Sequence, residues 1–284
     1  MKRPSPDSGT NSDSDGESSS VCSDSDPEVP FIINQTPPSP TKLPIAECRH
    51  GIQVFFINVN QGNFICVKNC RTNKIVIVDA GSSNLRFEEL DQRSLSYIFG
   101  NCMISAIILT HLDKDHYNYL KQEKFKAFLT INGVNFSNVI MVCGMSNPNQ
   151  RSLLTKVKIP VKIKYNVIPK PNTCIIQQVD GTTTVADEDI TAIEKQINDA
   201  FGYPNAFKFC LPMQGIVGKL TKNTCSLVVR LSCEGGNVLF TGDATEDTFK
   251  ALSMDPKNVE IFQKTNFFVI PHHGAETAGS NLWL

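Results

Sequence analysis

Short apolar runs separated by turn residues fill the chain between residues 50 and 145, and they return after residue 225. The runs are rich in Val, Ile and Phe and are too short for helices, which is typical of β-strands. They predict strands at 54–59, 64–67, 74–79, 105–110, 139–142, 226–231, 237–241 and 267–270, with a weaker candidate at 174–179. The run at 105–110 does not alternate with polar residues, so we expect it to be buried on both faces.

Helical periodicity is present at 85–99, 189–201 and 245–252, between groups of strands. The interval 146–223 is the least readable, and no internal repeat is evident. Strands with helices between them predict an α/β protein, α+β by some schemes, in which helices cover the sheets.

The N-terminal segment has a different composition from the rest of the chain. Residues 1–30 hold seven acidic and two basic side chains, a charge of −5, which leaves +4 on the remainder of a chain with net charge −1. Serines and prolines fill most of the other positions, and such a segment has too little apolar surface to fold. We therefore expect a disordered acidic tail at 1–45 and a folded domain at 50–284. The small basic excess does not by itself indicate a nucleic-acid partner.

The composition also narrows the compartment. No apolar run reaches the length of about 18 residues that a membrane-spanning helix needs, and the polar N-terminus lacks a secretory signal. The ten cysteines include no CxxC pair. We therefore expect reduced, mostly buried thiols, a cytoplasmic location and no contact with membranes.

Candidate chemistry concentrates in the histidines. Four of the five follow predicted strands, and the densest segment reads Thr110-His111-Leu112-Asp113-Lys114-Asp115-His116. Four metal-ligand side chains in six positions favour a loop wrapped around a cation, because the two carboxylates would otherwise repel each other. A polar turn with Asp115 as helix N-cap is the alternative. A calcium EF-hand is excluded because Asn118 and Lys124 stand where that loop needs Gly and Glu.

Two more carboxylates occupy the same kind of position. Asp79 and Asp243 each come at the end of a predicted buried strand, next to a glycine turn, and His272-His273 follows the last strand. Strand ends gather at one edge of an α/β sheet, so these side chains are expected to meet the 111–116 loop there.

In combination these motifs resemble the metallo-β-lactamase fold hydrolases. The similarity is greatest to the hydrolase domain of DNA-uptake competence proteins, and it covers roughly residues 52–280 in order. The segments that carry it are Thr110-His111-x-Asp113-x-Asp115-His116, Phe240-Thr241-Gly242-Asp243 and Pro271-His272-His273-Gly274-Ala275, with accessory stretches at 58–63, 78–81 and 223–227.

The resemblance implies a four-layer αββα sandwich with one or two divalent ions, Zn or Mn, at one edge. By position, His111 and Asp113 would hold the first ion, Asp115 and His116 the second, and Asp243 would bridge them. His273 would complete the second site, leaving His272 as proton donor or substrate contact, and Asp79 would orient the ligand loop from behind. The implied reaction is attack of a metal-bound hydroxide, held by Asp115, on a phosphodiester or nucleic-acid substrate.

Three departures from the family pattern keep other functions open. No histidine lies between His116 and His272, Asn118 and Asn63 replace the usual Gly and acid, and the chain stops eleven residues after His273. The last departure leads us to expect that the family's final helix and strand are lacking. The missing histidine favours an interaction module with little or no catalysis, and a thioester or amide hydrolase of the same fold is a third reading.

Overall fold

The computed structural model describes residues 51–144, 150–170, 173–178, 190–211 and 221–275. The expected tail at 1–45 and the chain end after residue 275 lie outside these residues.

A seven-stranded mixed sheet forms the larger half of the fold, with its strands in sequence order from β1 to β7. Strands β3 to β6 are mutually parallel, while β1, β2 and β7 run antiparallel to their neighbours. The strands are β1 (Ile52–Phe56), β2 (Phe64–Asn69), β3 (Lys74–Ala80), β4 (Met103–Leu109), β5 (Ile140–Gly144), β6 (Ile163–Lys170) and β7 (Thr173–Gln178).

A second sheet of four strands has the order β11-β10-β9-β8. Its centre is the hairpin expected from Glu234-Gly235-Gly236, in which Cys233 pairs with Gly236 across a two-residue turn. The strands are β8 (Phe207–Cys210), β9 (Val228–Cys233), β10 (Gly236–Phe240) and β11 (Phe267–Phe268).

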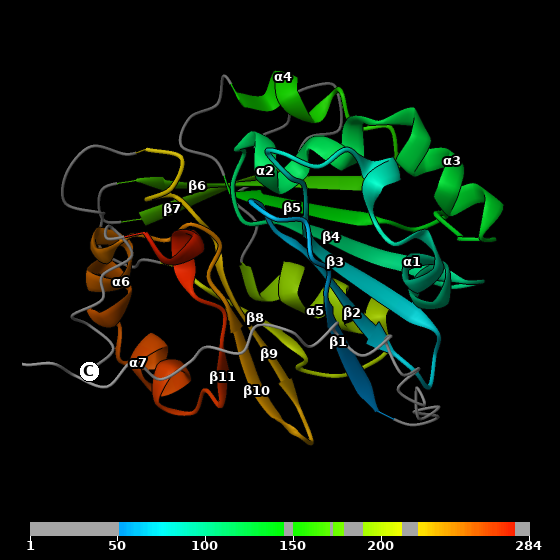
Figure 1. Cartoon of the computed structure of the whole chain (residues 1–284). Helices are drawn as coiled ribbons and strands as arrows, with labels where there is room; N and C mark the ends of the chain where they lie inside the picture. The colour runs from blue at the N-terminus through cyan, green and yellow to red at the C-terminus, as the bar shows by residue number, and fades with distance from the viewer. Residues whose placement is uncertain (1–50, 145–149, 171–172, 179–189, 212–220, 276–284) are drawn as a thin grey trace, which may run out of the picture. The chain divides into compact units, whose positions relative to one another are not determined.

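Helices cover the outer faces of both sheets, as Figure 1 shows for α1 and α3 on the larger sheet and for α6 and α7 beside the smaller one. The helix α5 packs against β3, β4 and β8. The α-helices are α1 (Gln92–Phe99), α2 (Lys114–Tyr117), α3 (Glu123–Ile131), α4 (Arg151–Leu154), α5 (Ile190–Phe201), α6 (Glu246–Ser253) and α7 (Pro256–Gln263).

The layers follow from the two-residue alternation of the strands. On β3, Ile75 and Ile77 face the cluster that includes Phe99 and Phe125 of the helices. Val76 and Val78 face the opposite way, into a cluster shared with Val229 and other side chains of the smaller sheet. A third cluster lies between the outer face of the smaller sheet and α6 and α7. The fold class expected from the sequence, an α/β sandwich of two sheets flanked by helices, is confirmed.

Several boundaries differ from those the sequence predicts. The helix expected at 85–99 begins only at Gln92, because Asp91 caps it by accepting hydrogen bonds from the backbone N–H groups of Arg93 and Ser94. The strand expected at 267–270 pairs over only two residues. The elements α3, α4, α7, β6 and β8 were not expected.

The structure describes the side chains of seven of the ten cysteines. All of those whose side chains are described are free, and most are buried. In the described ranges, every helix is too short or too polar to cross a bilayer.

Candidate metal centre

The loop that follows β4 carries two deeply buried imidazoles. His111 is 1% exposed and His116 is fully buried. The short helix α2 starts after Asp113, not after Asp115, and the Asp113 side chain makes no capping hydrogen bond. Helix capping therefore does not account for the acidic residues of this turn, and the alternative with Asp115 as N-cap is wrong.

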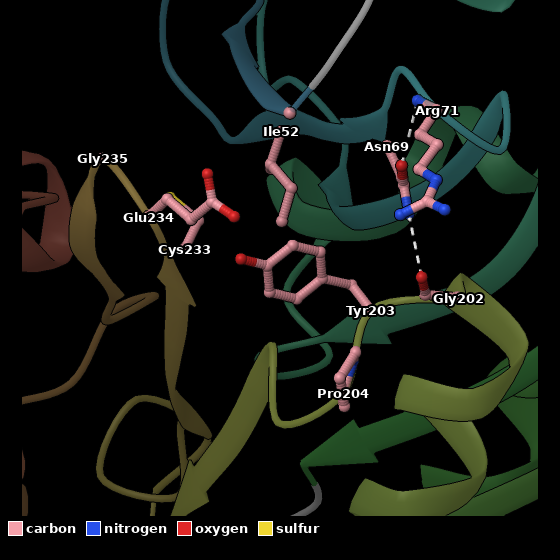
Figure 2. A pocket seen from close by; sticks show the side chains of 10 residues that line it. Ile52, Asn69, Arg71, Gly202, Tyr203, Pro204, Cys233, Glu234 and Gly235 are labelled. Atoms are coloured by element: carbon pink, nitrogen blue, oxygen red, sulfur yellow. Dashed lines mark hydrogen bonds between the residues drawn. The ribbon is translucent and has the colours of Figure 1, made fainter.

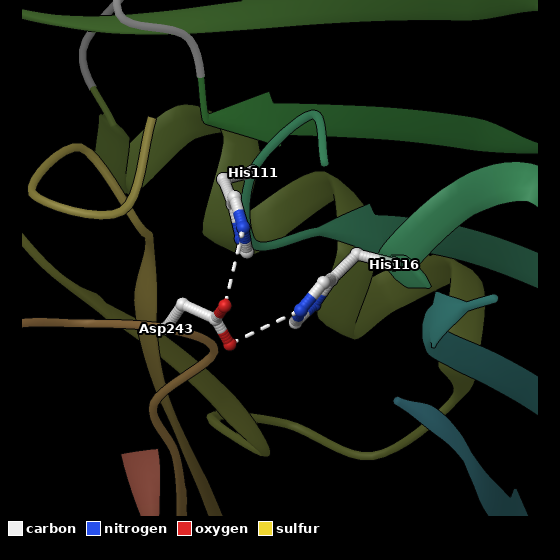
Figure 3. Close-up of side chains that lie close together, drawn as sticks. All are labelled: His111, His116 and Asp243. Carbon is white, nitrogen blue, oxygen red and sulfur yellow. Dashed lines mark ion pairs between the residues drawn. The ribbon is translucent and has the colours of Figure 1, made fainter. Parts of the chain in front are cut away.

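Three elements far apart in the sequence meet at this loop. Ligand atoms of His111, His116 and Asp243 lie within 4.8 Å of one another, and so do those of a second group, Asp115, His116 and His273. Figure 3 shows the first group, with both rings directed at the Asp243 carboxylate. The expected convergence at one sheet edge is thus present for these five residues.

The two carboxylate oxygens of Asp243 face different histidines. Oδ1 lies 3.1 Å from His116 Nε2 and 3.5 Å from His273 Nε2. Oδ2 lies 3.7 Å from His111 Nε2 and 3.9 Å from His272 Nε2. The side chains around Oδ1 and those around Oδ2 form the two halves of the cluster. An aspartate of the 111–116 loop joins each half: Asp115 Oδ2 is 3.3 Å from His273 Nε2, and Asp113 Oδ2 is 3.5 Å from His111 Nε2.

Asp79 supports the cluster from behind and is 1% exposed. Its Oδ1 accepts a hydrogen bond from the Thr110 backbone N–H at 2.8 Å, and its Oδ2 accepts one from the Thr110 hydroxyl at 2.7 Å. Its Oδ2 also lies 2.8 Å from His116 Nδ1. An ionised carboxylate can only accept, so Nδ1 of His116 carries a proton and Nε2 is left to face Asp243.

Glycines allow the neighbouring loops to approach the 111–116 turn. A Cβ added at Gly81 would lie 2.6 Å from the Asp115 carbonyl carbon, and one at Gly62 would lie 2.7 Å from the Asp115 oxygen. The backbone N–H of Asn63 donates to that same oxygen at 3.1 Å. The two accessory glycine motifs of the sequence therefore fix the position of the ligand loop.

The ionisable side chains of the cluster shift the pKa values of one another. Burial by itself lowers the pKa of His116, but the carboxylates of Asp79 and Asp243 outweigh it and raise that pKa to about 10. Burial also lowers the pKa of His111, and there the neighbouring His116 adds to the effect. The pKa of Asp243 is lowered although burial opposes this, because His116 and the other imidazoles favour its ionised form.

The residues present fit a divalent cation. His111 Nε2, His116 Nε2 and Asp243 Oδ1 are buried and make no hydrogen bond of acceptable geometry within the described residues. Buried polar atoms without hydrogen bonds are costly, and these three face a common space. Imidazole nitrogens with carboxylate oxygens are the donor set of zinc and of manganese sites. The cluster could therefore hold a metal ion.

The outer residues of the cluster have protein partners that the sequence did not reveal. Lys222 forms an ion pair with Asp113 Oδ1, and the Asn223 amide nitrogen lies 3.0 Å from His272 Nε2. Only Asn223 lies in a segment that sequence analysis singled out. Lys222 comes from a part of the chain without recognisable periodicity, so its pairing has no local signal.

A large cavity lies at the other ends of the strands. It has a volume of about 920 Å³ and lies between the β2–β3 turn, the α5–β8 turn and the β9–β10 hairpin. In Figure 2, Tyr203, Arg71 and Glu234 line it. None of the site residues expected from the sequence contributes to its lining. The candidate chemistry therefore lies in the His/Asp cluster.

Comparison with known proteins finds no family model and no curated protein that matches this chain.

Proposed function

We propose that this chain is a metal-dependent hydrolase of the metallo-β-lactamase type, acting on a phosphodiester. The observation that carries the proposal is that the two carboxylate oxygens of Asp243 face different pairs of histidines. Oδ1 faces His116 and His273, and Oδ2 faces His111 and His272. One carboxylate between two histidine pairs is the arrangement of a bridging ligand in a two-ion site, where the ions lie about 3.5–4 Å apart.

The residue roles follow from the two halves. His111 and Asp113 would hold one ion, and His116, Asp115 and His273 the other. Bound there, divalent zinc or manganese would supply positive charge at the scissile group and a water of lowered pKa. Asp79 keeps the His116 ring oriented, and Asp115 would hold the attacking water by a hydrogen bond.

His272 is the residue we assign to proton donation or substrate contact. Its side chain is 27% exposed and borders a cleft of about 400 Å³ that Asn223, Glu246 and Asp247 also line. Contact with the Asn223 amide restricts the orientation of the ring at the mouth of this cleft. His272 thus lies near Asp243 of the cluster and also lines the cleft, which is a position suited to a proton donor for the leaving group.

One departure from the family pattern is accommodated by the local structure. Asn118, in place of the usual glycine, has a φ of −64°, which any residue can adopt. Its side-chain oxygen accepts a hydrogen bond from the Ser82 backbone N–H at 3.0 Å. Asn118 therefore ties the 111–116 loop to the segment after β3, and its presence does not argue against a functional centre.

Metal content and hydrolysis together test the proposal. Purified protein loaded with zinc or manganese should retain about two ions per chain and cleave bis(p-nitrophenyl) phosphate. Asp243→Asn should retain fewer than one ion and lose activity roughly a thousandfold, since both halves share this carboxylate. Asp199→Asn, on the surface of α5, is the matched control and should behave as wild type. Wild-type protein without metal and without hydrolysis would refute the proposal.

Lys222 favours a second candidate, an interaction module that holds metal weakly. Its ion pair occupies one oxygen of Asp113, and the histidine ligand that the family usually has between His116 and His272 is missing. This candidate predicts at most one weakly bound ion per chain and no turnover in the same measurements.

The charge of the cleft favours a third candidate, hydrolysis of a neutral acyl substrate. Glu246 is paired with Lys250 at 2.7 Å, whereas no ion pair to a described residue is found for the exposed Asp247. A long polyanion crossing this cleft would meet its negative charge. Faster cleavage of p-nitrophenyl thioesters than of phosphodiesters by the metal-loaded protein would select this function.

A further inference from the structure

A second cavity, of about 500 Å³, lies on the outer face of the smaller sheet beside α7. Four cations line it: Lys208 from β8, Arg230 from β9, Lys257 from α7, and Lys264 directly after that helix. Glu260 is the one carboxylate among its described lining residues, so the net charge of the lining is +3. None of these residues belongs to the His/Asp cluster.

The strand register forces two of the cations together. Lys208 and Arg230 are directly opposite partners of the antiparallel β8–β9 pair, and Arg230 is in turn opposite Leu239 of β10. Leu239 belongs to the outer apolar cluster, so all three side chains leave the sheet on the α7 side. Directly opposite side chains have Cβ atoms about 4.5–5.5 Å apart, and like charges at that spacing are destabilising.

Among the described residues, this repulsion is compensated only in part, by Glu260, which acts on Lys208 and Arg230 without forming an ion pair with either. Glu260 is bound to Lys264, with Oε1 2.5 Å from Nζ. Lys208, Arg230 and Lys257 have no ion pair with any described residue, and the Nε of Arg230 is buried without a hydrogen-bond partner. Of the acids in the adjoining cavity, Glu194 accepts from the Phe209 backbone N–H and Asp255 from that of Lys257.

We propose that this cationic cavity binds a phosphate group. A guanidinium fork and three ammonium groups around a net charge of +3 suit a multiply charged oxyanion with several acceptor oxygens, better than a single carboxylate. The volume leaves room for the group that the phosphate is attached to. The phosphate belongs either to a small free ester or to the backbone of a nucleic acid, and the two share the same recognition chemistry.

Calorimetric titration of inorganic phosphate into the 284-residue chain, at an ionic strength held constant with sodium chloride, tests the site. Arg230→Gln and Lys208→Gln should each weaken binding about tenfold, since each removes charge-assisted hydrogen bonds. Lys195→Gln removes a paired lysine from the surface of α5 and should change the affinity less than twofold. Because the two cations repel each other, neither pocket variant should lower the thermal midpoint when phosphate is absent.

Asp243→Asn separates this site from the His/Asp cluster, because the variant should keep phosphate binding at the cavity. Binding that survives Arg230→Gln and Lys208→Gln unchanged, or that disappears only in Asp243→Asn, would overturn the proposal. Lack of phosphate binding to wild-type protein would overturn it as well. A short single-stranded DNA then identifies the source: displacement of phosphate assigns a nucleic-acid backbone, and lack of displacement assigns a small free phosphate ester.

Discussion

Replacing Asp79 by Asn removes the charge that orients the ligand loop while keeping the shape of the side chain. The carboxylate accepts three hydrogen bonds of 2.7–2.8 Å, two from Thr110 and one from His116 Nδ1. Hydrogen bonds to charged groups contribute about 1.5–3 kcal/mol, so the free energy of unfolding of the metal-free variant should be lower by about that amount. Partners of this kind also set ligand basicity and orientation, and metal affinity should fall about 10–100-fold.

Three measurements check this prediction. Chemical denaturation gives the loss of stability, and competition with a chromogenic chelator gives the zinc affinity. An NMR titration of the metal-free variant should show the pKa of His116 below its wild-type value of about 10, because Asp79 is a main cause of that elevation. Asp199→Asn is the exposed control. A variant that keeps wild-type zinc affinity and an unchanged His116 pKa would refute the role given to Asp79.

Three further predictions concern the same loop. Lys222→Met should strengthen zinc binding up to about fivefold in the chelator competition, since it frees Asp113 from an exposed ion pair worth at most about 1 kcal/mol; weaker binding would count against a ligand role for Asp113. Metal must displace the proton of His116, whose metal-free pKa is about 10, so the affinity for zinc should rise about tenfold per pH unit from pH 6 to 8. Calorimetry in buffers of different ionisation enthalpy should show the release of this proton. A zinc affinity that does not change with pH would contradict this assignment. Gly81→Ala should lower the free energy of unfolding by about 1–3 kcal/mol and weaken zinc binding, because its Cβ would clash with the Asp115 carbonyl; unchanged denaturation curves would show that the loops can separate without cost.

The parts of the fold that the sequence predicts well are those buried on both faces. The strands β3 and β4 are apolar along most of their length and lie between helices and the second sheet, so their composition alone identifies them. The strand β6 was missed because Lys164, Pro169 and Lys170 interrupt its pattern. The helix α3 has no recognisable start, since its N-cap Gln122 makes no side-chain capping bond. For α7 a start signal is present in the sequence, since Asp255 caps the helix and Pro256 occupies its first position.

Periodicity alone misplaced the start of α1. Leu85 fits the apolar spacing, but the Ser82 hydroxyl oxygen accepts hydrogen bonds from the backbone N–H groups of Asn84 and Leu85 and holds the chain in a turn. Side-chain bonds of this local kind compete with helix formation and leave little trace in a hydrophobic pattern.

The candidate site was predictable to the extent that topology determines it. Strand ends bring His111, Asp243 and His273 to one edge, and the sequence order of the motifs is enough to expect that. The partner of Asp113 was not predictable, because Lys222 reaches it through a tertiary contact that follows no spacing rule. The division of the Asp243 oxygens between two histidine pairs depends on rotamers, which a sequence pattern does not encode.

Backbone strain gives an argument for the site that is independent of motif resemblance. Among the described residues, seven other than glycine have a positive φ, and four of these are asparagines, the type that tolerates this conformation best: Asn60, Asn73, Asn101 and Asn205. The other three are Asp79, His272 and His273, with φ of 55°, 47° and 51°. Such a residue costs about 1–3 kcal/mol; it persists only where the surrounding structure holds it in place, and residues of this kind cluster at functional sites. Turns free of a functional constraint would accept Asn or Gly at these positions, as the other described positions with positive φ do. The remaining strain is confined to one supporting carboxylate and two imidazoles of a single cluster. Folding stability alone would not require this, so the strain supports a functional requirement for the exact orientation of these three side chains.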